Sequence, residues 1–169
     1  MVKTSIIKFL QIQEELGLLD IINGIENDFE KRLLVQKIFY ILTKFDFYIN
    51  VKFNFYKYGP YSPDLADFYF DSLEINIERN ETLYNYQFNE REKEILQKVK
   101  NVLDAWGTDV KRWEYYSSLL YIHEDMYFSK WNIDSVEAKL ARDKPKLYDI
   151  YKFKTALQDL KKLGLIKKH

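Results

Sequence analysis

The residues best suited to chemistry gather in one short stretch, His123-Glu124-Asp125. A zinc-binding helix requires a second histidine one turn away, and the chain's other histidine is His169, its last residue. There is no cysteine, which excludes thiolate nucleophiles, thiolate metal sites and disulfides. No phosphate-binding glycine loop, nucleophile elbow or calcium loop occurs either. We therefore predict a protein with no catalytic residues, no metal and no cofactor, and assign His123 to packing or to the surface.

The bulk composition is that of a globular protein. The chain has 169 residues, of which 47% are hydrophobic and 31% charged, and this length fits one domain. No apolar run approaches the roughly 20 residues of a membrane helix, and the first residues lack the pattern of a signal peptide. Together with the absence of cysteine, these features predict a cytoplasmic protein that does not enter a membrane.

Aromatic residues are the compositional outlier, at 17%, with 14 Tyr and 12 Phe. A biased genome composition explains them without any function. Interface chemistry also explains them, because tyrosine supplies a large contact area at low entropic cost. Both interpretations stay open.

The helices are predicted from apolar residues at helical spacing and from their caps. Asp28 is the expected N-cap of an amphipathic helix that reaches Phe45, and Asn89 with Glu92 resembles a capping box. After Phe88 the chain reads as four helices, the last ended by Gly164 in a Schellman motif.

Two stretches alternate polar and apolar residues instead. Residues 49–57 predict a strand, and residues 73–88 predict a hairpin around a polar turn. Between them, Ser62 is expected to cap a helix that begins at Pro63 and reaches about Leu73. The predicted fold is mainly α with a small antiparallel β-sheet (α+β). Residues 1–88 would form a winged-helix-like lobe, and residues 89–169 a helical lobe packed against it in one compact domain.

The turn Tyr58-Gly59-Pro60-Tyr61-Ser62-Pro63 joins the predicted strand to that helix. Glycine adopts backbone conformations that other residues resist, and proline restricts the next dihedral angle. The turn is interpreted first as a rigid strand-to-helix corner. The alternative is that it directs the helix at a partner, with Tyr58 and Tyr61 at the contact.

The segment Leu33-Leu34-Val35-Gln36-Lys37-Ile38-Phe39-Tyr40-Ile41-Leu42, followed by Phe53 to Leu65 with the Gly59-Pro60 turn, resembles the YwgA-like family of prokaryotic proteins. It is more loosely similar to the SocA-type Panacea antitoxin domain. The resemblance covers mainly residues 29–75 and 140–166. It implies a winged-helix-like or helical module, and in the Panacea case toxin neutralisation through protein contacts. It implies no catalytic residues.

The helix after the turn carries a row of carboxylates at Asp64, Asp67, Asp71 and Glu74. Their spacing of three, four and three residues places them on one helical face. Such a face repels phosphates, so direct DNA reading by this helix is disfavoured. It is either a solvated face or a docking surface for a basic partner, such as an RNA-cleaving toxin.

The charge is also divided along the chain. Residues 1–88 hold 9 Lys/Arg against 13 Asp/Glu, and residues 89–169 hold 17 against 13. The basic second half therefore gives a weaker, alternative prediction of a nucleic-acid surface, because basic residues interleaved with aromatic residues suit single strands or phosphates. The residues of this predicted surface are Lys139, Arg142, Lys144, Lys146, Lys152 and Lys154.

Two functional hypotheses follow. The first is a non-catalytic protein-interaction module of the antitoxin or defence-regulator kind, with the acidic helix as its contact surface. The second is a winged-helix DNA-binding transcriptional regulator, expected to be a homodimer.

Overall fold

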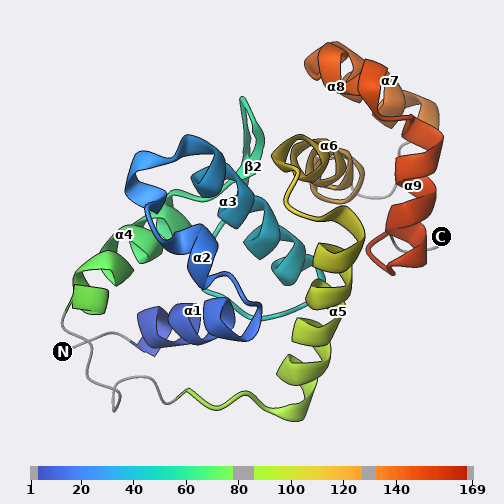
Figure 1. Ribbon diagram of the computed structural model, residues 1–169. Helices are drawn as coiled ribbons and strands as arrows, with labels where there is room; N and C mark the ends of the chain where they lie inside the picture. The colour runs from blue at the N-terminus through green and yellow to red at the C-terminus, as the bar shows by residue number, and fades with distance from the viewer. Residues whose placement is uncertain (1–3, 78–85, 127–131, 167–169) are drawn as a thin grey trace.

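The computed structural model describes residues 4–77, 86–126 and 132–166 (Figure 1). The first part of the chain forms α1 (Thr4–Glu15), α2 (Leu19–Ile22), the 3-10 turn η1 (Ile25–Asn27), α3 (Phe29–Lys44), β1 (Asn54–Tyr56), β2 (Gly59–Tyr61) and α4 (Pro63–Ile77). The second part forms α5 (Glu90–Trp106), α6 (Val110–Leu120), the π-helical turn η3 (Tyr121–Met126), α7 (Ile133–Asp143), α8 (Pro145–Ile150) and α9 (Phe153–Lys162).

Helix α3 is the centre of the molecule. Every residue from Leu33 to Leu42 is buried, and a helix that is buried on all sides must be covered all round. Helices α4, α5 and α6, strand β2 and η1 all pack against it. In Figure 1, α1, α2 and α4 lie on one side of α3 and α5 and α6 on the other, while α7, α8 and α9 lie beyond α6.

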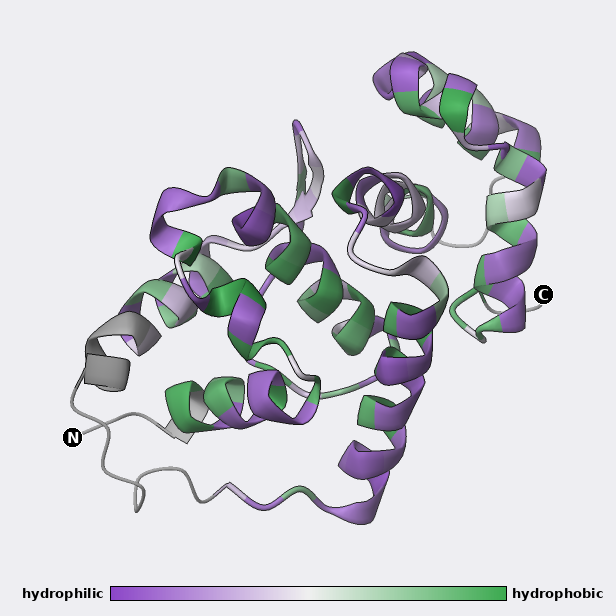
Figure 2. Ribbon diagram, viewed as in Figure 1, coloured by the Kyte–Doolittle hydropathy of each residue, from purple (hydrophilic) through white to green (hydrophobic). Residues whose placement is uncertain are grey.

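The hydrophobic core runs through both halves of the sequence. It joins Phe39 of α3, Tyr69 of α4, Val99 of α5 and Trp113 of α6 in one cluster. The outer helices α5 and α9 alternate hydrophilic and hydrophobic residues along their length (Figure 2), which is the pattern of helices with one face in water. The prediction of a mainly α protein with a small β-sheet is confirmed.

The predicted helix ends are confirmed at three places. The Asp28 side chain accepts a hydrogen bond from the Lys31 amide at 3.1 Å, and Asn89 with Glu92 forms a complete capping box. Gly164 has φ +77° and the Leu165 amide donates to the Leu160 carbonyl at 3.0 Å, as in a Schellman motif. These caps are local hydrogen bonds, so the local sequence specifies them.

The predicted strand over residues 49–57 is wrong in its length. Only Asn54–Tyr56 forms β1, and its partner β2 begins three residues later, with Tyr56 opposite Gly59 and Asn54 opposite Tyr61. Ile49, Val51 and Phe53 still pack against the core. The alternation therefore indicated which side chains face the core, and a strand forms only where a second chain segment supplies a hydrogen-bonding edge.

The predicted hairpin over residues 73–88 is also wrong where the structure describes it. Helix α4 continues to Ile77, and residues 86–88 belong to no strand; residues 78–85 lie outside the described part. Extending an existing helix adds one hydrogen bond per residue fixed, whereas a new hairpin must first close a loop. Among the described residues, the β-hairpin is β1–β2, and it precedes α4.

Candidate functional site

The turn singled out in the sequence is the second strand of this hairpin. Lys57 and Tyr58 connect β1 to β2, and Gly59 has φ +93°, a conformation suited to glycine. The interpretation as a strand-to-helix corner is therefore corrected. Gly59-Pro60-Tyr61 forms a strand edge that packs on α3 and α6, and only Ser62 separates it from α4.

Ser62 begins α4 in the predicted way. Its hydroxyl oxygen accepts a hydrogen bond from the Leu65 amide at 3.2 Å, and Pro63 occupies the first helical position. The side chain of Gln36 on α3 forms two hydrogen bonds with the backbone of Ser62. Its side-chain amide donates to the Ser62 carbonyl at 2.9 Å, and its side-chain oxygen accepts from the Ser62 amide at 2.8 Å. The start of α4 is thus attached to the central helix.

Replacing Gln36 with leucine should lower the free energy of unfolding by about 1–2 kcal/mol, because the buried Ser62 amide would lose its partner. The Ser62 carbonyl would lose the Gln36 donor and keep the Ala66 amide. Chemical denaturation measures the change. The matched control is Gln97→Leu. The exposed Gln97 side chain donates to the exposed Asn101 side chain at 3.1 Å, and its loss should leave stability nearly unchanged. Equal effects in the two variants would contradict the anchoring role of Gln36.

The predicted carboxylates face solvent. Asp64, Asp67 and Asp71 are exposed, while Leu65, Tyr69 and Ser72 on the other side of α4 are buried. None of the three aspartates has an ion-pair partner within 4 Å among the described residues. The side chain of Glu74 lies outside the described part. This face of α4 therefore carries negative charge that the described residues leave uncompensated.

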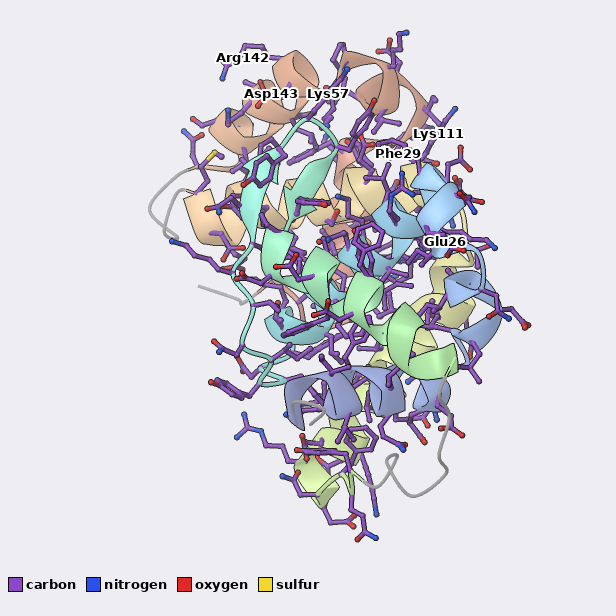
Figure 3. All side chains as sticks on the ribbon, turned by 90° about the vertical axis from the view of Figure 1, so that its left-hand side faces the viewer. Glu26, Phe29, Lys57, Lys111, Arg142 and Asp143 are labelled. Carbon is purple, nitrogen blue, oxygen red and sulfur yellow. The ribbon has the colours of Figure 1, made fainter. Side chains whose placement is uncertain are left out.

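Tyrosines of the hairpin, which immediately precedes α4, are partly exposed. Tyr56 is 47% exposed and packs edge-on against Tyr61, with ring centres 5.6 Å apart. Tyr58 is 37% exposed and packs against Phe29 at the start of α3, at 5.2 Å. In Figure 3, α4 and the hairpin face the viewer, with Lys57 and Phe29 at the hairpin tip. We call this surface, Tyr56, Tyr58, Tyr61, Asp64, Asp67 and Asp71, the acidic-aromatic face.

Tyrosines elsewhere divide between core and surface. Tyr40, Tyr69 and Tyr115 are fully buried, whereas Tyr48 is 76% exposed. Composition alone therefore does not separate the two interpretations of the aromatic content, because packing and exposed contact area both account for part of it.

Beneath the hairpin lies a group of charges that the sequence did not reveal. Lys37 of α3 is fully buried, and its ammonium donates to the Pro60 carbonyl at 2.7 Å. Lys144, which links α7 to α8, donates to the Lys57 carbonyl and pairs with Glu114 of α6 at 3.2 Å. Burial lowers the pKa of Lys37 to about 7; Glu114 acts against this shift and Lys144 adds to it. We call Lys37, Glu114 and Lys144 the hairpin clamp.

The predicted basic set is not one free surface. Lys144 is only 7% exposed and belongs to the hairpin clamp. Lys139 pairs with Asp143 at 2.8 Å, and Arg142 lies 3.7 Å from the same carboxylate. Lys146, Lys152 and Lys154 are exposed. Lys139 and Arg142 are therefore neutralised by the neighbouring Asp143. Lys144 is buried, so it cannot contribute to the predicted nucleic-acid surface.

Asp125, two residues after His123, connects two elements of the fold. Asp125 accepts a hydrogen bond from the Tyr40 hydroxyl at 2.5 Å and forms an ion pair with Lys44, which ties η3 to α3. His123 is 9% exposed. Within residues 4–77, 86–126 and 132–166, no three His, Cys, Asp or Glu side chains are grouped so that they could hold a metal ion.

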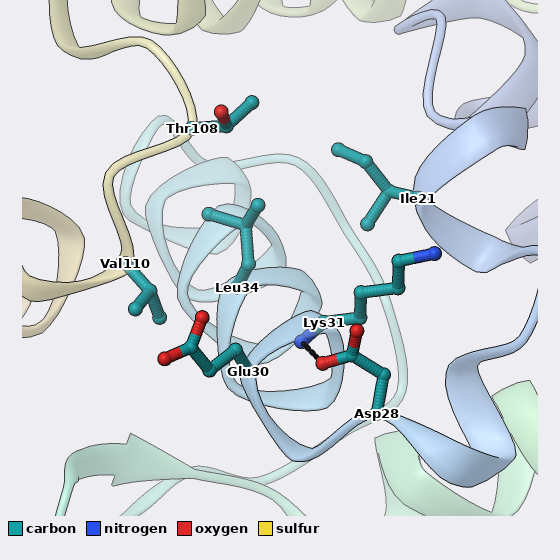
Figure 4. A pocket seen from close by; sticks show the side chains of 7 residues that line it. All are labelled: Ile21, Asp28, Glu30, Lys31, Leu34, Thr108 and Val110. Carbon is teal, nitrogen blue, oxygen red and sulfur yellow. Dashed lines mark hydrogen bonds between the residues drawn. The ribbon is translucent and has the colours of Figure 1, made fainter.

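Cavities at two places were not predicted from the sequence. One of about 270 Å³ lies at the start of α3 and is lined by Ile21, Asp28, Glu30, Lys31, Leu34, Thr108 and Val110 (Figure 4). Asp28 is already engaged as a helix cap, as its dashed hydrogen bond shows. Another of about 290 Å³ lies beside Lys8 and Tyr48, where the Lys8 ammonium is held by Glu92 at 3.2 Å. Lys31 in the first cavity donates to the Asn23 carbonyl at 2.8 Å, and Tyr86 in the second donates to the Glu92 carboxylate at 3.1 Å.

In the part of the chain that the structure describes, no helix combines the length and the apolar character needed to cross a membrane. Comparisons with protein-family models, with curated proteins and with solved structures found no match to this chain.

Proposed function

We propose that this protein is a non-catalytic interaction module that binds a basic protein through the acidic-aromatic face, in the manner of an antitoxin or a defence-associated regulator. The observation that carries the proposal is the row of exposed aspartates on α4, which have no ion-pair partner among the described residues and which follow the exposed hairpin tyrosines Tyr56 and Tyr58 in the chain. Tyrosine and opposite charge are typical of specific protein contacts.

The positions of the aspartates support a partner more than solubility alone. Asp64 lies in the first turn of α4, where the helix dipole favours a negative charge. Asp67 and Asp71 lie further along the helix and four residues apart, where like charges cost the helix roughly 0.2–0.5 kcal/mol. A cationic partner would remove this repulsion and replace it with attraction.

Asp67→Lys combined with Asp71→Lys should weaken partner binding by about tenfold or more, which corresponds to about 1.4 kcal/mol. The tagged protein is expressed in its native host, the captured protein is identified by mass spectrometry, and the affinity of the two purified proteins is then measured at two salt concentrations. Leaving Asp64 unchanged preserves the first turn of α4, so the fold of the variant should be intact.

The matched control is Glu14→Lys with Glu94→Lys, two exposed carboxylates on α1 and α5 that introduce the same change in net charge. This control should bind the partner almost as tightly as the wild type. The proposal is wrong if no specific protein is captured, if the captured protein is acidic, or if both double variants lose the same affinity. Retention that disappears on nuclease treatment would favour nucleic-acid binding instead.

A further inference from the structure

Three backbone carbonyls in the hairpin or next to it accept hydrogen bonds from side chains of other elements. Lys37 donates to the carbonyl of Pro60, Lys144 to that of Lys57, and Gln36 to that of Ser62. These three donors come from α3 and from the α7–α8 connection, so residues 57–62 are attached on both sides. A hairpin with three residues in each strand has little stability of its own. Its position therefore depends on its packing against α3 and α6 and on these hydrogen bonds.

Lys37 is poorly suited to carry a charge where it lies. A lysine ammonium has three hydrogens to donate, and Lys37 has one hydrogen bond, to Pro60, among the described residues. It makes no ion pair within 4 Å there, and the nearby Glu114 carboxylate pairs with Lys144. A neutral amine needs fewer partners, so the surroundings of Lys37 favour loss of its proton.

The charges around Lys37 determine what protonation does. Glu114 on α6 and Lys144 beside α8 are the charged groups that act on it. When Lys37 is protonated, the hairpin clamp contains two positive charges and one negative charge, and the excess charge lies under Gly59 and Pro60. When Lys37 is neutral, Lys144 and Glu114 balance one another. The side of this site that can open most easily is the short hairpin, because α3 and α6 are long core helices.

We propose that the hairpin clamp is a proton-sensitive device in which protonation of Lys37 loosens the β1–β2 hairpin and its deprotonation packs the hairpin firmly against α3 and α6. The transition is centred near pH 7, where the pKa of Lys37 lies. Tyr56, Tyr58 and Tyr61 of the acidic-aromatic face lie on or between the two strands. The consequence for binding rests on the function proposed above: mild acid disorganises the tyrosines that contact the partner.

The test is a titration of the isolated chain by nuclear magnetic resonance. Lysine labelled with ¹³C at Cε reports the proton on Lys37, and ¹⁵N amide resonances of residues 54–61 report the hairpin, both between pH 5.5 and 9. We expect the Lys37 resonance and the Gly59 amide to move with one common midpoint near pH 7. In Lys37→Met the Gly59 amide should not titrate in this range. In Lys93→Met, which removes an exposed lysine of α5, it should titrate as in the wild type.

The proposal is overturned by a Lys37 resonance that does not move, or by one that moves while the hairpin amides stay constant. Backbone-directed assignment of the wild type identifies Lys37 even if Lys37→Met fails to fold. Because no partner is present, the titration is independent of the binding experiment. A normal titration together with an unaffected Asp67→Lys/Asp71→Lys variant would retain the clamp and reject the proposed binding face.

Discussion

Replacing Gly59 with alanine should lower the free energy of unfolding by roughly 2–5 kcal/mol, combining backbone strain with overpacking. Gly59 has φ +93°, and a Cβ placed there would lie 2.6 Å from the Ser118 hydroxyl oxygen. The backbone carbonyl oxygen of Glu114 lies 3.7 Å from the same point, an ordinary contact distance, so the steric conflict is with Ser118. Chemical denaturation of Gly59→Ala measures the loss.

Gly24→Ala is the matched control for the part of the loss that comes from backbone strain at a positive φ. Gly24 has φ +78°, and a Cβ there meets nothing within 4 Å, so only the strain of a positive φ should appear. Adding Ser118→Ala to Gly59→Ala should restore part of the stability by removing the oxygen that the methyl group meets. Equal losses for Gly59→Ala and Gly24→Ala would show that the close packing of the hairpin on α6 contributes little.

The free energy of unfolding of the wild type should rise by roughly 2–3 kcal/mol between pH 6 and pH 9, and most of this rise should be absent in Lys37→Met. Burial lowers the pKa of Lys37 to about 7 in the folded protein, against its ordinary value of 10.5. Below pH 7 both states bind the proton, and the folded state bears the full cost of a buried charge. Above pH 7 the folded state releases the proton while the unfolded state keeps it, so stability increases with pH.

The measurement is denaturant unfolding at several pH values up to 9. Burial raises the pKa values of Tyr40 and Tyr69, and this opposes stability above the ordinary tyrosine pKa of about 10, so higher pH is avoided. Lys93→Met serves as the control and should retain the wild-type slope. A slope in Lys37→Met equal to that of the wild type would assign the pH dependence to other groups.

Features that depend on near neighbours in the chain were predictable. The caps at Asp28 and Asn89 and the Gly164 stop join residues only a few positions apart, so residue type and spacing specify them. The exposed row Asp64, Asp67 and Asp71 follows from helical geometry once α4 exists. The length of α4 was underestimated because alternation over five residues, Leu73 to Ile77, cannot distinguish a short strand from a helix already under way.

The sequence by itself determined the mainly helical fold, the helix ends at Asp28, Asn89 and Gly164, and the acidic row on α4, because each depends on contacts within a few residues. Only the tertiary structure decided that Gly59 and Pro60 form a strand edge and that Lys37 and Lys144 lie beneath the hairpin. Lys37 reaches Pro60 across 23 positions and Lys144 reaches Lys57 across 87. A lysine in a sequence is ordinarily interpreted as a surface residue. Here long-range packing buries Lys37 and Lys144, and backbone carbonyls of the hairpin accept the hydrogen bonds that water would otherwise accept.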